Sequence, residues 1–247
     1  MNLIFLSPHF PLHYYNFAVQ AKLAGIDVLG IGEAPFESLR SELRDALTDY
    51  CFVNSLENYD HVYRACGYLI SRHGRLHHVE SHNEHWLPLE ASIREDFNLP
   101  GLKREEIARI RRKSSMKNVF SSVGVPLARG MIYSNLEAAF RFADEVGYPL
   151  FIKPDTGVGG SGTFKIHGPA DLERFSREKP PGEFLVEEFI DGYLATFDGV
   201  TDLNGEPVYY ISHFSNTGVY EVLKDNSDLS YYSLREIPED LLTLGLK

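Results

Sequence analysis

The chain has 247 residues, of which 43% are hydrophobic and 24% are charged, and its net charge of −11 argues against a general nucleic-acid or anionic-membrane surface. This length predicts about one or two soluble globular domains. The two cysteines, Cys51 and Cys66, form no disulfide framework, and neither a signal peptide nor a membrane-spanning run is visible, so we expect a cytoplasmic protein that does not engage a membrane.

Apolar runs alternate with amphipathic segments through residues 1–99. We predict strands at residues 2–6, 26–31, 50–53 and 75–80, and helices at residues 16–23, 37–47, 60–72 and 86–97. This alternation predicts right-handed βαβ units and a parallel sheet covered on both faces, in an α/β domain of Rossmann-like topology. The dinucleotide fingerprint is missing from its usual place, because the first strand leads into residues 7–11, Ser-Pro-His-Phe-Pro.

A group of histidines and glutamates follows this domain's third helix. It comprises His73, His77, His78, His82 and His85, with Glu80 and Glu84. His78 and His82 have the i, i+4 spacing of a metal pair, but only if that stretch is helical, so we favour strand-end and loop histidines over a metal site. Because ligands of open α/β sheets bind at the carboxyl ends of strands, Asn83 or Glu84 is a secondary candidate for substrate contact.

The segment at residues 98–101, Asn-Leu-Pro-Gly, is the clearest domain boundary. Beyond it, residues 103–117 are rich in lysine and arginine, most of which we expect on a solvated helical face. A strand at 128–133 and a helix opened by a capping box at 134–137 follow. A small α+β unit is completed by a strand ending at Lys153-Pro154, a strand at 163–166, a helix at 169–179 and a strand at 184–190. A hairpin is predicted around residues 202–205.

The glycine-rich stretch after Lys153-Pro154 determines the functional interpretation. Gly157, Gly159 and Gly162 match GxGxxG, but a short β-type run follows them, whereas a dinucleotide site requires a helix there, which disfavours an NAD-dependent dehydrogenase. A P-loop is also excluded, since no Lys-Ser or Lys-Thr follows. A glycine loop between two strands can cover a polyphosphate with its N–H groups while a lysine supplies charge. The alternative is a glycine-rich hairpin with an exposed lysine.

Several motifs, in order along the chain, together resemble the ATP-grasp superfamily and, within it, the carboxylate–amine or carboxylate–thiol ligases. Residues 112–117, with Gly-Val-Pro at 124–126, resemble the family's DK..M…G.P helix, in which Arg112 replaces the aspartate. Residues 149–154 resemble the strand that carries the phosphate-binding lysine, residues 157–162 the loop over the phosphates, and residues 186–192 the hinge strand against adenine. The resemblance implies a Rossmann-like pre-ATP-grasp domain at 1–99, an ATP-grasp N-terminal subdomain at 100–183, and an incomplete C-terminal subdomain at 184–247.

The resemblance also implies a site for ATP. Its ATP-binding residues would be Lys113, Lys153, Gly157, Gly159, Gly160, Ser161, Gly162, Glu187, Glu188, Phe189 and Ile190. The family's ribose-binding glutamate falls at Leu194, so Glu187 or Asp198 would have to replace it. Ligands for Mg²⁺ are expected beyond Lys247, so we assign neither a metal ligand nor a catalytic residue within the chain.

The implied reaction is phosphorylation of a carboxylate by ATP, followed by attack of an amine or thiol on the acyl phosphate. The expected partners are therefore ATP, a small-molecule carboxylate, and an amine or thiol, and a homodimer is an open expectation. Metal ions neutralise the charge that develops during phosphoryl transfer. A non-catalytic nucleotide-binding or regulatory module is therefore the alternative.

Overall fold

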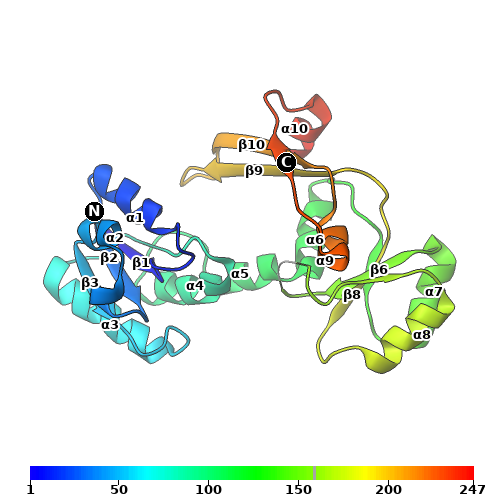
Figure 1. Cartoon of the computed structure of the whole chain (residues 1–247), viewed down its shortest axis with the longest axis horizontal. Helices are drawn as coiled ribbons and strands as arrows, with labels where there is room; N and C mark the ends of the chain where they lie inside the picture. The colour runs from blue at the N-terminus through cyan, green and yellow to red at the C-terminus, as the bar shows by residue number, and fades with distance from the viewer. Residues whose placement is uncertain (158–159) are drawn as a thin grey trace. The chain divides into compact units, whose positions relative to one another are not determined.

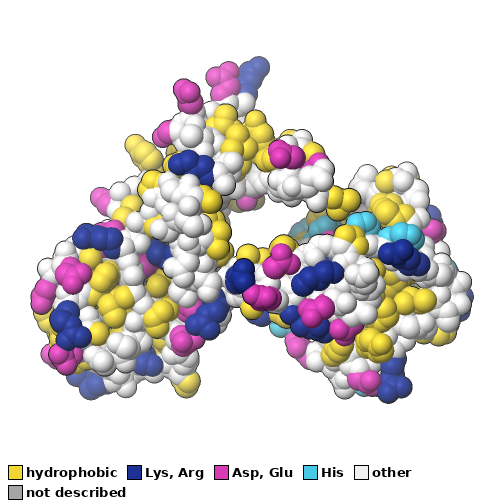
Figure 2. Space-filling view, turned by 180° about the vertical axis from the view of Figure 1, so that it is seen from behind, with side chains coloured by type: hydrophobic (Ala, Val, Ile, Leu, Met, Phe, Trp, Pro, Cys, Tyr) yellow, Lys and Arg dark blue, Asp and Glu magenta, His cyan; other side chains and the backbone are white. Residues whose placement is uncertain are grey.

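The computed structural model describes residues 1–157 and 160–247, which form two compact units, Met1–Ala108 (unit 1) and Arg109–Lys247 (unit 2) (Figure 1). Figure 2 shows acidic and basic side chains interspersed over the face that it presents. Within the described residues, no helix is both long enough and apolar enough to cross a membrane.

Unit 1 is built on a parallel sheet with the strand order β3-β2-β1-β4. The strands are β1 (Asn2–Leu6), β2 (Asp27–Gly32), β3 (Asp49–Phe52) and β4 (His78–Glu80). The side chains of Ile4 and Leu29 belong to one buried cluster, and those of Phe5 and Val28 belong to another. Both faces of the sheet are therefore covered, which confirms the predicted Rossmann-like arrangement and explains the continuous apolar strands.

Each strand of unit 1 is followed in the chain by a helix. These helices are α1 (Tyr15–Leu23), α2 (Ser41–Ala46), α3 (Tyr59–His73) and α4 (Leu87–Asp96), with short 3₁₀ turns at Phe36–Ser38 and Glu84–Trp86. The single helix predicted at 37–47 is wrong, because Leu39 and Arg40 have extended backbones. Leu39 is buried there, and the Arg40 guanidinium lies 3.7 Å from the centre of the Tyr15 ring. These tertiary contacts hold the backbone extended in spite of its helical pattern.

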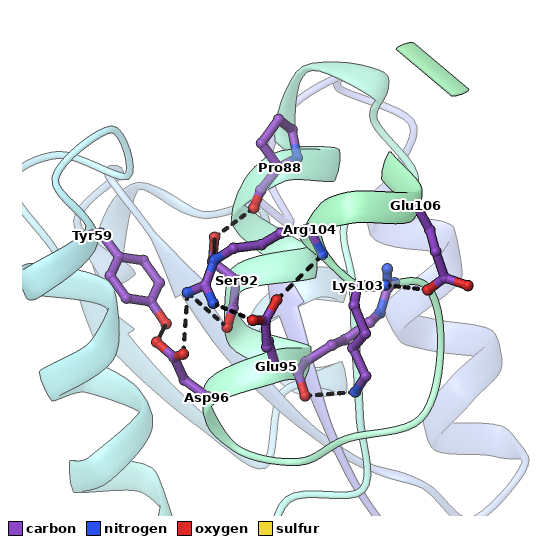
Figure 3. A network of polar contacts seen from close by, with 9 residues as sticks. Tyr59, Pro88, Ser92, Glu95, Asp96, Lys103, Arg104 and Glu106 are labelled. Atoms are coloured by element: carbon purple, nitrogen blue, oxygen red, sulfur yellow. Dashed lines mark hydrogen bonds and ion pairs between the residues drawn. The ribbon is translucent and has the colours of Figure 1, made fainter. Parts of the chain in front are cut away.

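The start of α5 (Arg104–Arg111) is tied to unit 1 by a polar network (Figure 3). Arg104 donates a hydrogen bond to Asp96 at 3.1 Å, and Asp96 also accepts one from the Tyr59 hydroxyl at 2.5 Å. Lys103 Nζ donates to the carbonyl of Arg94 at 2.8 Å. Two basic residues that were expected on a solvated face therefore bind neighbouring elements, and unit 1 extends beyond residue 99.

Unit 2 contains an antiparallel sheet with the strand order β5-β8-β6-β7. Its strands are β5 (Gly130–Ile132), β6 (Leu150–Pro154), β7 (Phe164–Ile166) and β8 (Phe184–Glu188). Figure 1 shows α7 (Leu136–Val146) and α8 (Pro169–Glu178) on one side of this sheet, with α6 (Lys113–Ser122) and α9 (Val219–Asp225) on the other. Leu150 and Ile152 are fully buried in the core with α7 and α8. The other side of the sheet carries Phe151, Lys153 and Glu187 together with the buried Leu185.

Two sequence predictions for unit 2 differ in outcome. The N-cap of α7 is Asn135, whose side chain accepts a hydrogen bond from the Ala138 backbone N–H at 2.9 Å, so the predicted capping box began one residue too early. The hairpin is confirmed by β9 (Leu194–Thr201) and β10 (Pro207–Ser215), and β11 (Tyr231–Ser233) extends their sheet. Asp202 stabilises the turn by accepting from the backbone N–H of Asn204 at 2.8 Å. A last helix, α10, covers Glu239–Gly245.

The thiols of unit 1 give a direct test of its packing. Cys66 on α3 is fully buried, and burial raises the pKa of its thiol to about 12. Because the thiolate is the reactive form, we expect Cys66 to react with a thiol-specific disulfide reagent only after unit 1 unfolds. Labelling at mildly alkaline pH, with and without urea, measures this. A Cys51→Ala variant assigns the remaining signal to Cys66, and rapid labelling of that variant in the absence of urea would contradict the packing.

Candidate functional site

One face of the unit 2 sheet combines cationic, acidic and aromatic side chains. Along β6, Phe151 and Lys153 alternate with the buried Leu150 and Ile152, so they project from the face opposite to the α7–α8 core. Glu187 of β8 is the register partner of Phe151 and therefore lies on the same face. The sequence thus places a lysine, a glutamate and an aromatic ring on adjacent strands.

A cavity of ≈ 170 Å³ opens on this face. Its lining residues are Lys113, Phe151, Lys153, Pro154, Gly157, Gly160, Ser161, Thr163, Val219 and Tyr220. The ring of Tyr220, from α9, meets that of Phe151 edge-on with the centroids 5.3 Å apart. A larger cavity of ≈ 300 Å³ in unit 1 is lined by Pro35, Phe36, Glu37, Tyr50 and Phe52. It contains no lysine and no glycine, so the unit 2 cavity is the stronger candidate for a phosphate ligand.

The predicted glycine loop forms part of the cavity wall. Gly157, Gly160 and Gly162 have φ values of +124°, +72° and +72°, which side-chain-bearing residues rarely adopt. A Cβ on Gly160 would also lie 3.0 Å from Leu223 Cδ1. The predicted Gly159 lies outside the described residues, as does Val158. The loop leads into strand β7 and not into a helix, which agrees with the rejection of a dinucleotide fingerprint.

Lys113 and Lys153 come from separate elements and line the same cavity. Lys113 lies at the first turn of α6, where its Nζ donates to the Gly157 carbonyl at 2.8 Å. Lys153 lies on β6 and forms an ion pair with Glu187, with Nζ and Oε2 separated by 2.5 Å. Two separate elements therefore each place a lysine in the lining of one cavity.

Asp155 is a buried residue that the sequence interpretation missed. Its carboxylate accepts hydrogen bonds from the Ser114 backbone N–H at 2.8 Å, from Ser114 Oγ at 2.9 Å and from Arg112 Nε at 3.0 Å. It thereby caps the N-terminus of α6 and fixes that helix next to β6. The sequence did contain a signal for this contact. Asp155 directly follows Lys153-Pro154, and its charge is opposite to that of Arg112, which replaces the family's aspartate.

Glu187 lies between two lysines. Its Oε1 is 2.5 Å from Lys117 Nζ, and its Oε2 is 2.5 Å from Lys153 Nζ. The sequence interpretation directed this carboxylate to adenine or ribose, whereas here both of its oxygens are held by ammonium groups. Lys117 was not among the predicted site residues, although its i, i+4 spacing from Lys113 places both on one face of α6.

The remaining hinge residues lie at the end of β8. Glu188 accepts from the Arg129 backbone N–H at 2.7 Å and from Arg129 Nε at 2.8 Å, and the hydrogen bonds from Arg129 lower the pKa of its carboxyl group. The Phe189 ring lies 3.6 Å from Lys165 Nζ, and Ile190 is exposed. None of these three lines the cavity.

The two ribose candidates also lie apart from the cavity lining. Leu194 is the first residue of β9, and Asp198 on the same strand accepts from the Thr196 hydroxyl at 2.6 Å. The structure therefore brings together the predicted lysines and described loop glycines, but not the residues considered for the ribose.

The histidine-rich stretch of unit 1 is spread over several local contacts. His73 contacts Asp49 at 2.7 Å, and His85 contacts Glu57 at 2.7 Å. His78 lies on β4, whereas His82 follows that strand with φ +56°, so their spacing is not helical. Within residues 1–157 and 160–247, no group of three or more His, Cys, Asp or Glu side chains is placed to hold a metal ion.

Comparison with known proteins agrees with this geometry. Residues 112–195 match the family model "Carbamoyl-phosphate synthase L chain, ATP binding domain". The carbamoyl phosphate synthase large chain of Clavibacter michiganensis is 34% identical over 99 residues, which is 38% of this chain and 9% of that protein.

Two solved structures share the fold. The L-amino acid ligase from Bacillus licheniformis has a TM-score of 0.68 and 18% identity, over 97% of this chain and 56% of that one. The biotin carboxylase domain of the Hydrogenobacter thermophilus 2-oxoglutarate carboxylase, in complex with MgADP and bicarbonate, has a TM-score of 0.65 and 20% identity, over 86% of this chain and 49% of that one. This chain thus covers well under two thirds of each relative. The matched segment at residues 112–195 and the shared fold support the predicted resemblance to the ATP-grasp superfamily.

Proposed function

We propose that unit 2 binds ATP in the cavity beneath the glycine loop, and that the chain is an ATP-grasp ligase or a part of one. Such a ligase activates a carboxylate as an acyl phosphate, which an amine or thiol then attacks. The observation that carries the proposal is the convergence of Lys113 and Lys153, from different elements, on one glycine-walled cavity. Charge from two lysines, together with loop N–H groups, suits a polyphosphate.

The cavity residues would act by binding and positioning. Lys113 and Lys153 would neutralise phosphate oxygens, and the glycine loop would keep water from a reactive acyl phosphate. The adenine would extend beyond the cavity lining toward Phe189, whose ring centroid lies 6.1 Å from that of Phe151, and the backbone at residues 188–190 would contact the adenine edge there. The aromatic pair of Phe151 and Tyr220 supplies an apolar wall beside the cationic groups.

Magnesium is expected from the family, but the cavity lining offers no obvious place for it. Among the described residues, the lining contains lysine, hydroxyl, glycine and apolar groups but no carboxylate. Because Mg²⁺ prefers carboxylate, phosphate and water oxygens in an octahedral arrangement, these residues do not fit it, and no step of the proposal passes through a metal that they hold. A nucleotide-binding module without turnover is therefore the second candidate function.

Calorimetric titration of the 247-residue protein with ATP, ADP and NAD, together with an ADP-release assay in Mg²⁺, tests the proposal. We expect saturable binding of ATP and ADP and no binding of NAD. Release of ADP that requires both an added carboxylate and an added amine or thiol would support the ligase. Binding without turnover would favour the nucleotide-binding module, and the absence of ATP binding would overturn both.

Assembly is a separate proposal. One structural relative is described as a domain dimer, which motivates a homodimer here. Sedimentation equilibrium of the purified chain measures this directly, and a single monomer mass over a range of concentrations would contradict it.

A further inference from the structure

Three charged side chains form a cluster beside the candidate ATP cavity. Glu187 is only 5% exposed, and its carboxylate oxygens contact the ammonium groups of Lys117 and Lys153, each at 2.5 Å. The Lys153 side chain is 27% exposed and lines the cavity, whereas Lys117 does not line it. One lysine of the cluster therefore faces the ligand space, and the other lies behind the shared carboxylate.

The positions of Lys117 and Glu187 in this cluster are constrained. Lys117 Nζ also donates to the Ala128 carbonyl at 2.6 Å. Gly130 is the register partner of Glu187, and a Cβ on Gly130 would lie 3.0 Å from Glu187 Cγ. The glutamate stem therefore packs closely against the β5 backbone, which restricts the movement of its carboxylate.

The charges of the cluster do not cancel. Two ammonium groups share one carboxylate, so the three side chains carry a net positive charge. Without Lys117, Lys153 and Glu187 would form a neutral pair, and the carboxylate would repel a phosphate. Electrostatic interactions are strong over short distances and are screened less when the charges are partly buried. Removing the Lys117 charge should therefore change the electrostatic potential inside the cavity.

We propose that Lys117 is a positioning residue of the nucleotide site. It binds one oxygen of Glu187, so that Lys153 retains positive charge for the phosphates of ATP. This inference rests on the proposed function, because it takes ATP as the ligand of the cavity. It adds to the site a residue that does not touch the ligand.

A Lys117→Met variant, titrated with ATP and with adenosine, tests the inference. We expect ATP affinity to fall about tenfold and adenosine affinity to change little, because only the phosphates respond to the lost charge. Lys117→Arg, which keeps the charge, should bind ATP within about twofold of the wild type. The matched control is Arg141→Met, which removes a positive charge from an exposed pair on α7 and should leave ATP affinity unchanged.

The double variant Lys117→Met/Glu187→Gln separates positioning from simple structural support. Removing the carboxylate frees Lys153 again, so the double variant should recover most of the affinity lost in Lys117→Met. If Lys117 only supported the fold, the double variant would bind ATP at least as weakly as Lys117→Met. That result, or equal losses for ATP and adenosine, would overturn the inference.

The single variant Glu187→Gln provides a test that does not depend on whether Lys117→Met folds. It leaves two ammonium groups without a carboxylate, so we expect a severalfold gain in ATP affinity with adenosine unchanged. An unchanged or lower ATP affinity would contradict the inference. Titration of the wild type separates failure of the proposed function from failure of this inference. If the wild type does not bind ATP, the proposed function is wrong. If the wild type binds ATP and Lys117→Met binds it equally well, only the role of Lys117 is wrong.

Discussion

Replacing Lys153 with alanine should weaken ATP binding by about a hundredfold, or ~2.7 kcal/mol, because it removes a partly desolvated ammonium group from the cavity. Lys153 is the member of the Lys117–Glu187–Lys153 cluster that lines the ligand space. Its removal turns a net positive cluster into a neutral pair. Isothermal titration with ATP measures the loss, and adenosine should bind almost as before.

The fold should tolerate this substitution. Glu187 keeps its contact with Lys117, so no buried carboxylate is left without a partner. Thermal unfolding of Lys153→Ala should therefore stay close to that of the wild type, and Arg141→Ala on α7 provides a control for the loss of one positive charge. If Lys153→Ala binds ATP as tightly as the wild type, Lys153 does not contact ATP, and the cavity proposed as the ATP site is wrong.

Replacing Asp155 with alanine should lower the free energy of unfolding of unit 2 by about 3 kcal/mol, because it removes a buried, charged helix cap. Asp155 is only 1% exposed and accepts from Ser114 N–H, Ser114 Oγ and Arg112 Nε. The variant leaves the first turn of α6 without these acceptors. Lys113 lies in that turn, so ATP affinity should fall as well.

The measurement has to report on unit 2. The chain has a single tryptophan, Trp86, and it lies in unit 1, so urea unfolding should be followed by circular dichroism and by hydrogen exchange of the α6 amides. Glu137→Ala is the matched control, because it removes an exposed carboxylate of α7 and should cost no more than about 0.5 kcal/mol. If Asp155→Ala is no more destabilising than this control, the capping role is wrong.

Local sequence patterns predicted most of the elements. The alternation of apolar runs and amphipathic segments was sufficient for the parallel sheet of unit 1, and the turn residues at 202–205 were sufficient for the β9–β10 hairpin. The break between the 3₁₀ turn at Phe36–Ser38 and α2 was not predictable in this way. It depends on Arg40 stacking over Tyr15, a contact between separate elements.

In the candidate site, too, residues in local motifs could be predicted, whereas contacts between separate elements could not. Lys113, Lys153, Gly157 and Gly160, which line one cavity, could be predicted to lie together because each occupies a motif of short range. The contacts of Asp155 with Ser114 and of Glu187 with Lys117 were missed, because these residues lie 41 and 70 positions apart in the chain. Those pairings are created by the antiparallel sheet and by the docking of α6. The α9 wall was also missed, although Val219, Val222 and Leu223 have the i, i+3, i+4 spacing of an apolar helix face.

Gly160 has a consequence for attempts to redirect the ligand preference of the cavity. Its φ of +72° disfavours any side chain, and its contact with Leu223 leaves little room for one, so a mutant library has little to gain at this position. Thr163 and Tyr220 line the same cavity without a left-handed backbone. Variation concentrated at these two positions would test new ligand shapes while Gly160 keeps its contact with α9.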